Sequence, residues 1–186
     1  MAMTNVFTGA NGTLTLADED TPEGKDAKAV VDTYEMRTVG RVTNVEICVQ
    51  TNLQEYHEIG RRHPTSLHPG NIHISGKVGR AYINGALLEL LLGRGAGPNA
   101  VPEPYVQPVF NMTVSLNDPA VPGNSAALEL KGVKFQNWVY LLPEDDFVME
   151  NATFKALTVR VLDREAPAGG GQAVALTPEF ADAAAA

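Results

Sequence analysis

The chain has 186 residues, a length that favours one folded domain, and its 14 Lys and Arg against 22 Asp and Glu give a formal net charge of −8. This acidic balance argues against electrostatic binding to nucleic acid or to an anionic membrane surface, because both require clusters of cations. The single cysteine, Cys48, excludes an internal disulfide and a cysteine-built zinc site, and no apolar run reaches the roughly 18 residues of a membrane span. The first residues lack a signal-peptide pattern, so we expect synthesis and folding in a reducing cytoplasm.

Apolar and polar residues alternate with the period of a β-strand along most of the chain. Short strands are predicted at residues 12–16 and 29–33, with an acidic polar loop at residues 17–28 between them. The alternation is clearest in residues 41–51, where Val45, Ile47 and Val49 share one face and Asn44, Glu46 and Gln50 share the other. Further strands are predicted at residues 71–78, 105–116, 126–142 and 153–162. An interruption of the third of these at Gly132 indicates a β-bulge.

One segment, residues 79–92, has the spacing of an amphipathic helix. Its apolar residues Ile83, Leu87, Leu90 and Leu91 form a stripe on one face, and Gly93 follows where a C-terminal cap is expected. The sequence therefore predicts a mainly β protein, a sandwich or barrel with one flanking α-helix at residues 79–92.

The remaining segments are predicted to be connections. Residues 53–70 would form a long loop between two strands, and loops of this length in compact domains are usually functional or disordered. Residues 142–147 carry Pro and Asp in the pattern of a tight reversal. Residues 166–186 contain three consecutive glycines and end in four alanines, which is typical of a flexible tail. We expect one β domain over residues 1–165 and a flexible Gly/Ala-rich tail over residues 166–186.

Reactive residue types are present, but their arrangement does not indicate catalysis. His57, His63, His68 and His73 fall within 17 residues, yet their spacing matches no short zinc signature. The glycines after residue 92 follow the predicted helix, whereas a phosphate-binding loop would precede one. Ser66 lies in no nucleophile elbow. We therefore expect no enzyme activity, no resident metal and no cofactor.

The order of elements and three local motifs resemble the tail tube proteins of tailed bacteriophages, in particular those with contractile tails. The motifs are the strand that opens at Asn11, the strand–loop–strand–helix run of residues 42–92, and the closing run of residues 130–156 with its Trp138 and its Leu-Pro-Glu-Asp-Asp-Phe turn. The similarity extends over residues 11–162. The tubes of type VI secretion and of contractile injection systems are related to the same family.

This resemblance implies a structural virion protein that self-assembles into stacked hexameric rings. The rings would form the inner tail tube, a barrel-lined conduit for DNA ejection without specific DNA binding. The resemblance also implies contacts with the tail sheath, the baseplate or initiator and the tail terminator. The protein would be assembled in the bacterial host cytoplasm and end in the virion tail.

Two groups of residues are our candidates for ring stacking and for lining the lumen of such a tube. In the family, the loop that corresponds to residues 53–70 reaches the adjacent ring, and here it carries both charge signs, with Arg61 or Arg62 expected to meet carboxylates of the next ring. The candidate ring-stacking residues are Glu55, His57, Glu58, Arg61, Arg62, His63 and His68. Glu46 and Gln50, on the polar face of their strand, are the candidate lumen-facing residues.

Two other functions remain open at this level. The first is the tube of a contractile injection system or tailocin that carries no DNA. The second belongs to a different class, a monomeric β-barrel that binds a small apolar ligand in its mouth. A stable monomer with a cavity would favour the second.

Overall fold

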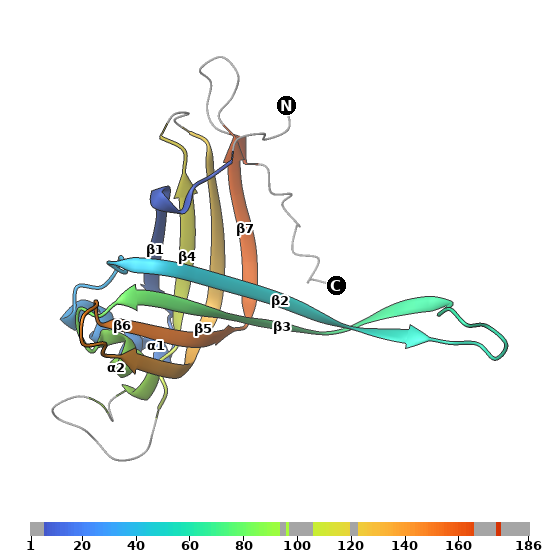
Figure 1. The fold of residues 1–186 in the computed structure, drawn as a ribbon, viewed down its shortest axis with the longest axis horizontal. Coiled ribbons are helices and arrows are strands. Elements are labelled where there is room, and N and C mark those ends of the chain that lie inside the picture. Colours follow the sequence, from blue (N-terminus) through green and yellow to red (C-terminus); the bar gives the residue numbers. More distant parts are fainter. Residues whose placement is uncertain (1–5, 94–95, 97–105, 120–122, 166–173, 176–186) are drawn as a thin grey trace.

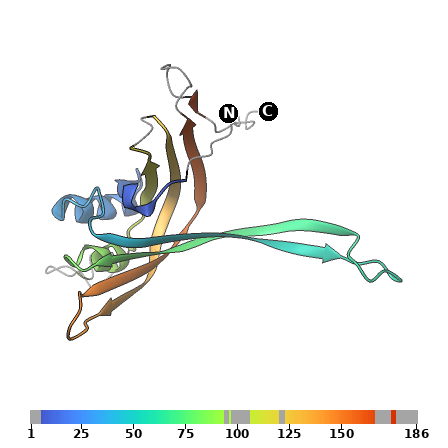
Figure 2. The same ribbon diagram turned by 45° about the horizontal axis from the view of Figure 1, so that its top comes forward.

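The computed structural model describes residues 6–93, 96, 106–119, 123–165 and 174–175, and it is mainly β, as predicted. Strands curl into a half-barrel beside two α-helices, and one long hairpin projects from it (Figures 1 and 2). The elements are η1 (Gly9–Asn11), β1 (Gly12–Asp18), α1 (Pro22–Thr33), β2 (Val42–Tyr56), β3 (Ser66–Ala81), α2 (Ala86–Leu92), β4 (Phe110–Asn117), β5 (Ser125–Leu141), β6 (Met149–Ala156), β7 (Thr158–Glu165) and β8 (Val174–Ala175).

The long strand β5 belongs to both halves of the curled sheet. The main strand order is β1-β4-β5-β6-β3-β2, and every pair in it is antiparallel. The first half of β5 lies between β4 and β7, and its second half pairs with β6. Between the halves lies the predicted bulge, where Gly132 has a φ of +63° and its N–H donates to Asn111 Oδ1 at 3.1 Å. A side chain is disfavoured at this positive φ, so glycine allows one strand to change sheets.

The core lies between the curled sheet and the two helices. Helix α1 contributes Ala27, Val30 and Val31, and α2 contributes Leu87 and Leu90. Phe110, Phe135 and Phe154 fill the sheet side of the core. The helices are joined by Tyr34, whose hydroxyl donates to Glu89 Oε1 at 2.8 Å, and this hydrogen bond raises the pKa of the phenol.

Helix α1 corrects the prediction of a loop at residues 17–28 and a strand at residues 29–33. Thr21 is its N-cap and accepts from the Gly24 N–H at 3.0 Å, while Pro22 occupies the first turn. These are ordinary helix-start signals, and Ala27, Val30 and Val31 follow at helical spacing. The β-branched pair Val30 and Val31 favoured a strand locally, but packing against the sheet stabilises the helix instead.

The predicted helix at residues 79–92 is shorter in the structure. Residues 79–81 complete β3, and α2 begins only at Ala86, after Gly85. Ile83 is therefore not part of the helical stripe and is exposed. Gly93 does occupy the C-cap with a φ of +62°, as predicted.

Three other predictions need correction or cannot be compared. Residues 53–70 are not a loop, because β2 runs to Tyr56 and β3 begins at Ser66. The single strand predicted at residues 153–162 is two strands, β6 and β7, which separate at the exposed Leu157. The predicted flexible tail at residues 166–186 lies outside the described residues except for the short strand β8, which pairs with β7.

A buried ion pair connects the second half-sheet to the segment before α2. Arg80 is 1% exposed and Glu150 is fully buried, and Arg80 Nε donates to Glu150 Oε1 at 2.5 Å. Trp138 Nε1 donates to the other carboxylate oxygen at 2.7 Å. Arg80 Nη2 donates to Asn84 Oδ1 at 3.1 Å and to the Asn84 carbonyl oxygen at 3.2 Å. The pair thus ties together β3, β5, β6 and the turn at Asn84.

We expect Glu150→Gln or Arg80→Met to lower the free energy of unfolding by about 3–5 kcal/mol, because either change leaves a buried charge without its partner. The measurement is urea unfolding of dilute protein, followed by far-ultraviolet circular dichroism. The double variant removes both charges but keeps an acceptor for Trp138, so it should lose less than either single variant. Lys28→Met at the exposed Asp18–Lys28 pair is the control and should change stability little. Additive losses in the double variant would contradict the coupling.

Candidate self-assembly surfaces

Beyond the half-barrel, β2 and β3 continue as a two-stranded arm, defined here as residues 50–73. Strand β3 pairs with β6 only from Ile74 to Ala81, so in the described part of the chain the arm has no third strand (Figures 1 and 2). Residues 50–56 alone extend about 20 Å at roughly 3.3 Å per residue. An isolated two-stranded hairpin is marginally stable in water, so an arm of this length is expected to be stabilised by another surface.

The arm has one apolar and one polar face. Val49 and Thr51 lie opposite Ile74 and Ile72, and Leu53 and Glu55 lie opposite Pro69 and Leu67. Directly paired residues share a face, so an apolar stripe continues from the core-facing side of the sheet along the arm. Its members Val49, Leu53, Leu67 and Ile72 are 52–63% exposed. The other face is polar, with Asn52 and His73 in a hydrogen bond of 3.3 Å.

The arm tip, residues 57–65, reverses the chain in a short ordered turn. Gly60 has a φ of +86°, the Arg61 N–H donates to the Glu58 carbonyl oxygen at 3.2 Å, and Thr65 N–H donates to the Tyr56 carbonyl oxygen at 2.8 Å. Arg61 forms an ion pair with Glu58 at 3.4 Å. An open hollow of about 480 Å³ lies against the tip; its lining residues are Arg61, Arg62, His63, Pro64 and Thr65.

The structure brings the predicted stacking residues to the outer half of the arm, although it changes their setting from loop to hairpin. Glu55 lies on β2 and His68 on β3, and the other five lie in the tip. His57 is 3.2 Å from Glu55, and His68 is 3.0 Å from the Ser66 hydroxyl. No group of three or more His, Cys, Asp or Glu in the described residues could hold a metal ion.

Glu46 and Gln50 lie on the exposed face of the half-sheet β5-β6-β3-β2, opposite the core. Register places Glu46 beside Lys77, which in turn is beside Thr153, and it places Gln50 beside His73. Lys155 lies in the next row of the same face, so the face carries both charge signs. Because the opposite face of this half-sheet packs on the core, the polar face is the one that contacts water or polar cargo.

One edge of the sheet is open along its whole length. In the described part of the chain β2 pairs with β3 alone, which leaves its other edge without a partner strand. An unpaired strand edge is a template for pairing with another chain. The arm and the part of this edge on the half-barrel, residues 42–49, are therefore two surfaces that can accept a partner.

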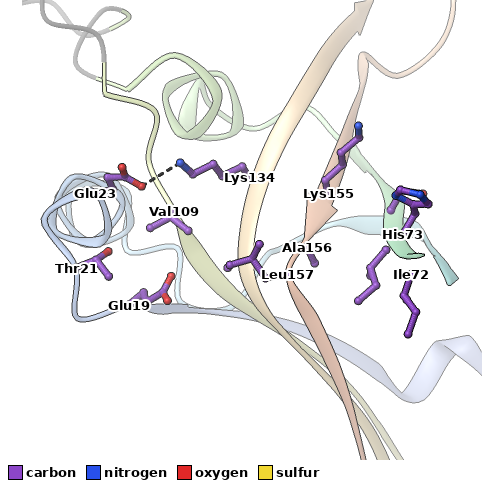
Figure 3. A pocket seen from close by; sticks show the side chains of 13 residues that line it. Glu19, Thr21, Glu23, Ile72, His73, Val109, Lys134, Lys155, Ala156 and Leu157 are labelled. Atoms are coloured by element: carbon purple, nitrogen blue, oxygen red, sulfur yellow. Dashed lines mark hydrogen bonds and ion pairs between the residues drawn. The ribbon is translucent and has the colours of Figure 1, made fainter. Parts of the chain in front are cut away.

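A groove of about 650 Å³ lies at the root of the arm (Figure 3). Glu19, Thr21 and Glu23 approach it from the start of α1, and Ile72 and His73 approach it from β3. Lys134 Nζ contacts Glu23 Oε2 at 3.0 Å across the groove. The exposed Leu157 and Ile72 on its wall make this an open surface hollow rather than the interior of a barrel. Separately, none of the described helices is long and apolar enough to cross a membrane.

No protein-family model and no curated protein matches the sequence. Solved structures do match the fold. A chain of the sheath–tube complex of an extracellular contractile injection system, PVC, aligns with a TM-score of 0.57 at 12% identity, over 87% of this chain and 95% of that one.

Two further structures agree. A chain of the anti-feeding prophage tube-terminating cap aligns with a TM-score of 0.58 at 13% identity, covering 88% of this chain and 95% of that one. The SPP1 tail tube protein aligns at 0.51 and 9% identity, covering 84% of this chain and 78% of that one. Identities this low report the fold alone. The chain therefore has the tail-tube fold that its sequence motifs predict.

Proposed function

We propose that this chain is the structural subunit of a hollow tail tube and that it polymerises with copies of itself. The observation that carries the proposal is the arm, an ordered hairpin whose apolar face has no partner in the described part of the chain. The tail-tube fold supports it. A hairpin with an exposed apolar stripe requires a binding surface, and in a homopolymer the next subunit supplies one.

The energy available at the arm is sufficient for such a contact. Fully burying a Val, Leu or Ile side chain contributes about 1.5–3 kcal/mol. The stripe of Val49, Leu53, Leu67 and Ile72 is more than half exposed in the single chain, so its burial would contribute several kcal/mol in total. Polymerisation multiplies this contact along the tube, because every subunit presents one arm.

A second self-contact closes the ring in this proposal. The open edge of β2 would pair with a strand of the neighbouring subunit, so that the half-sheets join into one continuous barrel. A head-to-tail contact that closes gives a ring, and one that does not close gives a filament. We propose six subunits per ring from the family resemblance, with the arm joining successive rings.

The polar face with Glu46 and Gln50 would line the lumen of the barrel. On this face Glu46 lies beside Lys77 and offsets part of the positive charge of the lysines, which limits the phosphate contacts that would add DNA affinity through counterion release. We propose genome passage as the use of the conduit, with protein cargo in an injection system as the alternative. Sheath, baseplate or initiator, and terminator proteins are the proposed partners, and the virion tail is the proposed location.

The proposal is tested by negative-stain electron microscopy and sedimentation of the purified full chain over a range of concentrations. Rings or stacked hollow tubes are the expected result. Adding a baseplate extract as a source of initiator tests whether nucleation limits growth. A chain that stays monomeric under both conditions would overturn the proposal, and the groove at the root of the arm would then be screened for small ligands.

Shortening the arm should separate folding from assembly. Gln50 and His73 are register partners, so a two-residue Asn-Gly turn between them can replace residues 51–72. We expect this variant to keep the circular dichroism spectrum of the body and a similar urea midpoint, because the removed side chains are largely exposed. It should form no stacked tubes in the microscope. Normal tubes from the shortened chain would exclude the arm as the stacking element.

Reversing one charge on the polar face should change the lumen without changing the outside of the tube. Glu46→Lys would replace the carboxylate beside Lys77 with another cation, on a face that already carries Lys155 and its register partner Lys134. We expect tubes of normal appearance that retain short DNA at low salt, with retention lost as salt rises. The control is Glu129→Lys on the other half-sheet, and retention is measured by co-sedimentation of labelled DNA. Equal DNA retention by the two variants would show that Glu46 does not line the lumen.

A further inference from the structure

The arm tip and the turn between β5 and β6 lie at opposite ends of the same half-sheet. Arg80, Glu150 and Tyr140 are register neighbours near one end of the four strands, close to that turn. Ile74 and Ala156 pair near the other end, where the arm begins. Both views place the arm tip far from the β5–β6 turn along the long axis of the molecule (Figures 1 and 2).

The β5–β6 turn, residues 142–148, is an exposed acidic and apolar surface. Glu144, Asp145 and Asp146 are all exposed, and the turn contains no Lys or Arg. The neighbouring apolar residues Leu141, Leu142 and Phe147 are 59–80% exposed. Asp146 Oδ1 accepts from the Phe147 N–H at 2.7 Å, whereas Glu144 and Asp145 form no ion pair within the described residues.

The arm tip has the complementary character. Ile59 is fully exposed and Tyr56 is more than half exposed, so the tip also offers apolar contacts. Arg61 is paired with Glu58, while Arg62 forms no ion pair within the described residues. The hollow beside Arg61 and Arg62 is open and cationic, whereas the acidic turn connects the ends of β5 and β6. Charge and apolar exposure are therefore complementary between the two ends.

We propose that the arm tip of one copy binds the β5–β6 turn of the next copy, with Arg62 facing Glu144 and Asp145. This inference rests on the proposed function, since it names the surface that receives the arm. Two different patches of one chain make a heterologous contact, and because they lie at opposite ends of the sheet the contact repeats in one direction and elongates the assembly. Apolar contacts of Ile59 and Tyr56 with Leu142 and Phe147 would surround the ion pairs and exclude water from them.

A charge swap tests the pairing. Arg61→Glu with Arg62→Glu, and separately Glu144→Arg with Asp145→Arg, should each reduce the pelletable polymer at least tenfold. All four changes in one chain should restore it, because the charges are again opposite. The matched control is Glu19→Arg with Asp20→Arg just before α1, which makes the same change of net charge as the Glu144 and Asp145 reversal and should polymerise normally. Polymerisation unaffected by both reversals, or lost equally in the control, would overturn the pairing.

Disulfide trapping provides an independent readout, because it reports that two positions lie close together and does not rely on restoring a charge pair. In a Cys48→Ser background, Arg62→Cys with Asp145→Cys should give a ladder of reducible multimers after mild oxidation, and neither cysteine alone should give more than dimers. Arg62→Cys with Glu19→Cys, which directs the tip to the groove instead, should give no ladder. Assembled tubes without the first ladder, or with the second, would overturn this inference and leave the proposed function intact. A wild-type chain that never assembles would overturn both.

Discussion

The buried pair of Arg80 and Glu150 is the interaction on which the placement of the arm depends. Strand β3 is the only strand that belongs to both the half-barrel and the arm and also has neighbours on both sides within the described residues. The ion pair joins it to β6, and Trp138 adds β5 through the same carboxylate. Because a buried charge without its partner is costly, the strands cannot slip in register without breaking this arrangement. A fixed register sets the direction in which the arm leaves the body.

A second constraint comes from the division of β5 between two half-sheets. The bulge at Gly132 allows the strand to turn, and Leu157 marks the place where the next strand makes the same change. The Leu157 N–H donates to the Lys131 carbonyl oxygen at 3.0 Å, so the two turning points lie side by side. The half-sheet that contains β1 and β4 thus packs against α1, while the half-sheet β5-β6-β3-β2 keeps an exposed polar face and a free edge. This separation lets a small domain build a core and still present two surfaces that a partner can contact.

Alternation in the sequence predicted the strands at residues 12–16, 41–51, 71–78 and 126–142, the bulge at Gly132, the reversal after β5 and both faces of β2, because these depend on local pattern and burial. It missed what depends on partners elsewhere. Residues 53–70 contain Pro, Gly and charged residues and lack strict alternation. A bulge opposite Asn52 also shifts the period of alternation in β3. For both reasons the sequence pattern predicted a loop where the structure has a hairpin. Helix α1 had recognisable signals at Thr21 and Pro22, which the acidic composition around them obscured. The sequence placed the stacking candidates in one segment, but only the structure shows that this segment is a paired hairpin.

An exposed apolar stripe and an open strand edge would ordinarily promote indiscriminate aggregation. Several features of this chain oppose it. The net charge of −8 repels copies at a distance, the polar face of the arm disfavours face-to-face stacking of two arms, and the bulge in β3 makes the arm irregular. Because the overall charge is repulsive, the cationic tip is one of the few places where approach of a second copy is attractive. In the proposed assembly, repulsion elsewhere and attraction at the tip would together favour the head-to-tail orientation over others.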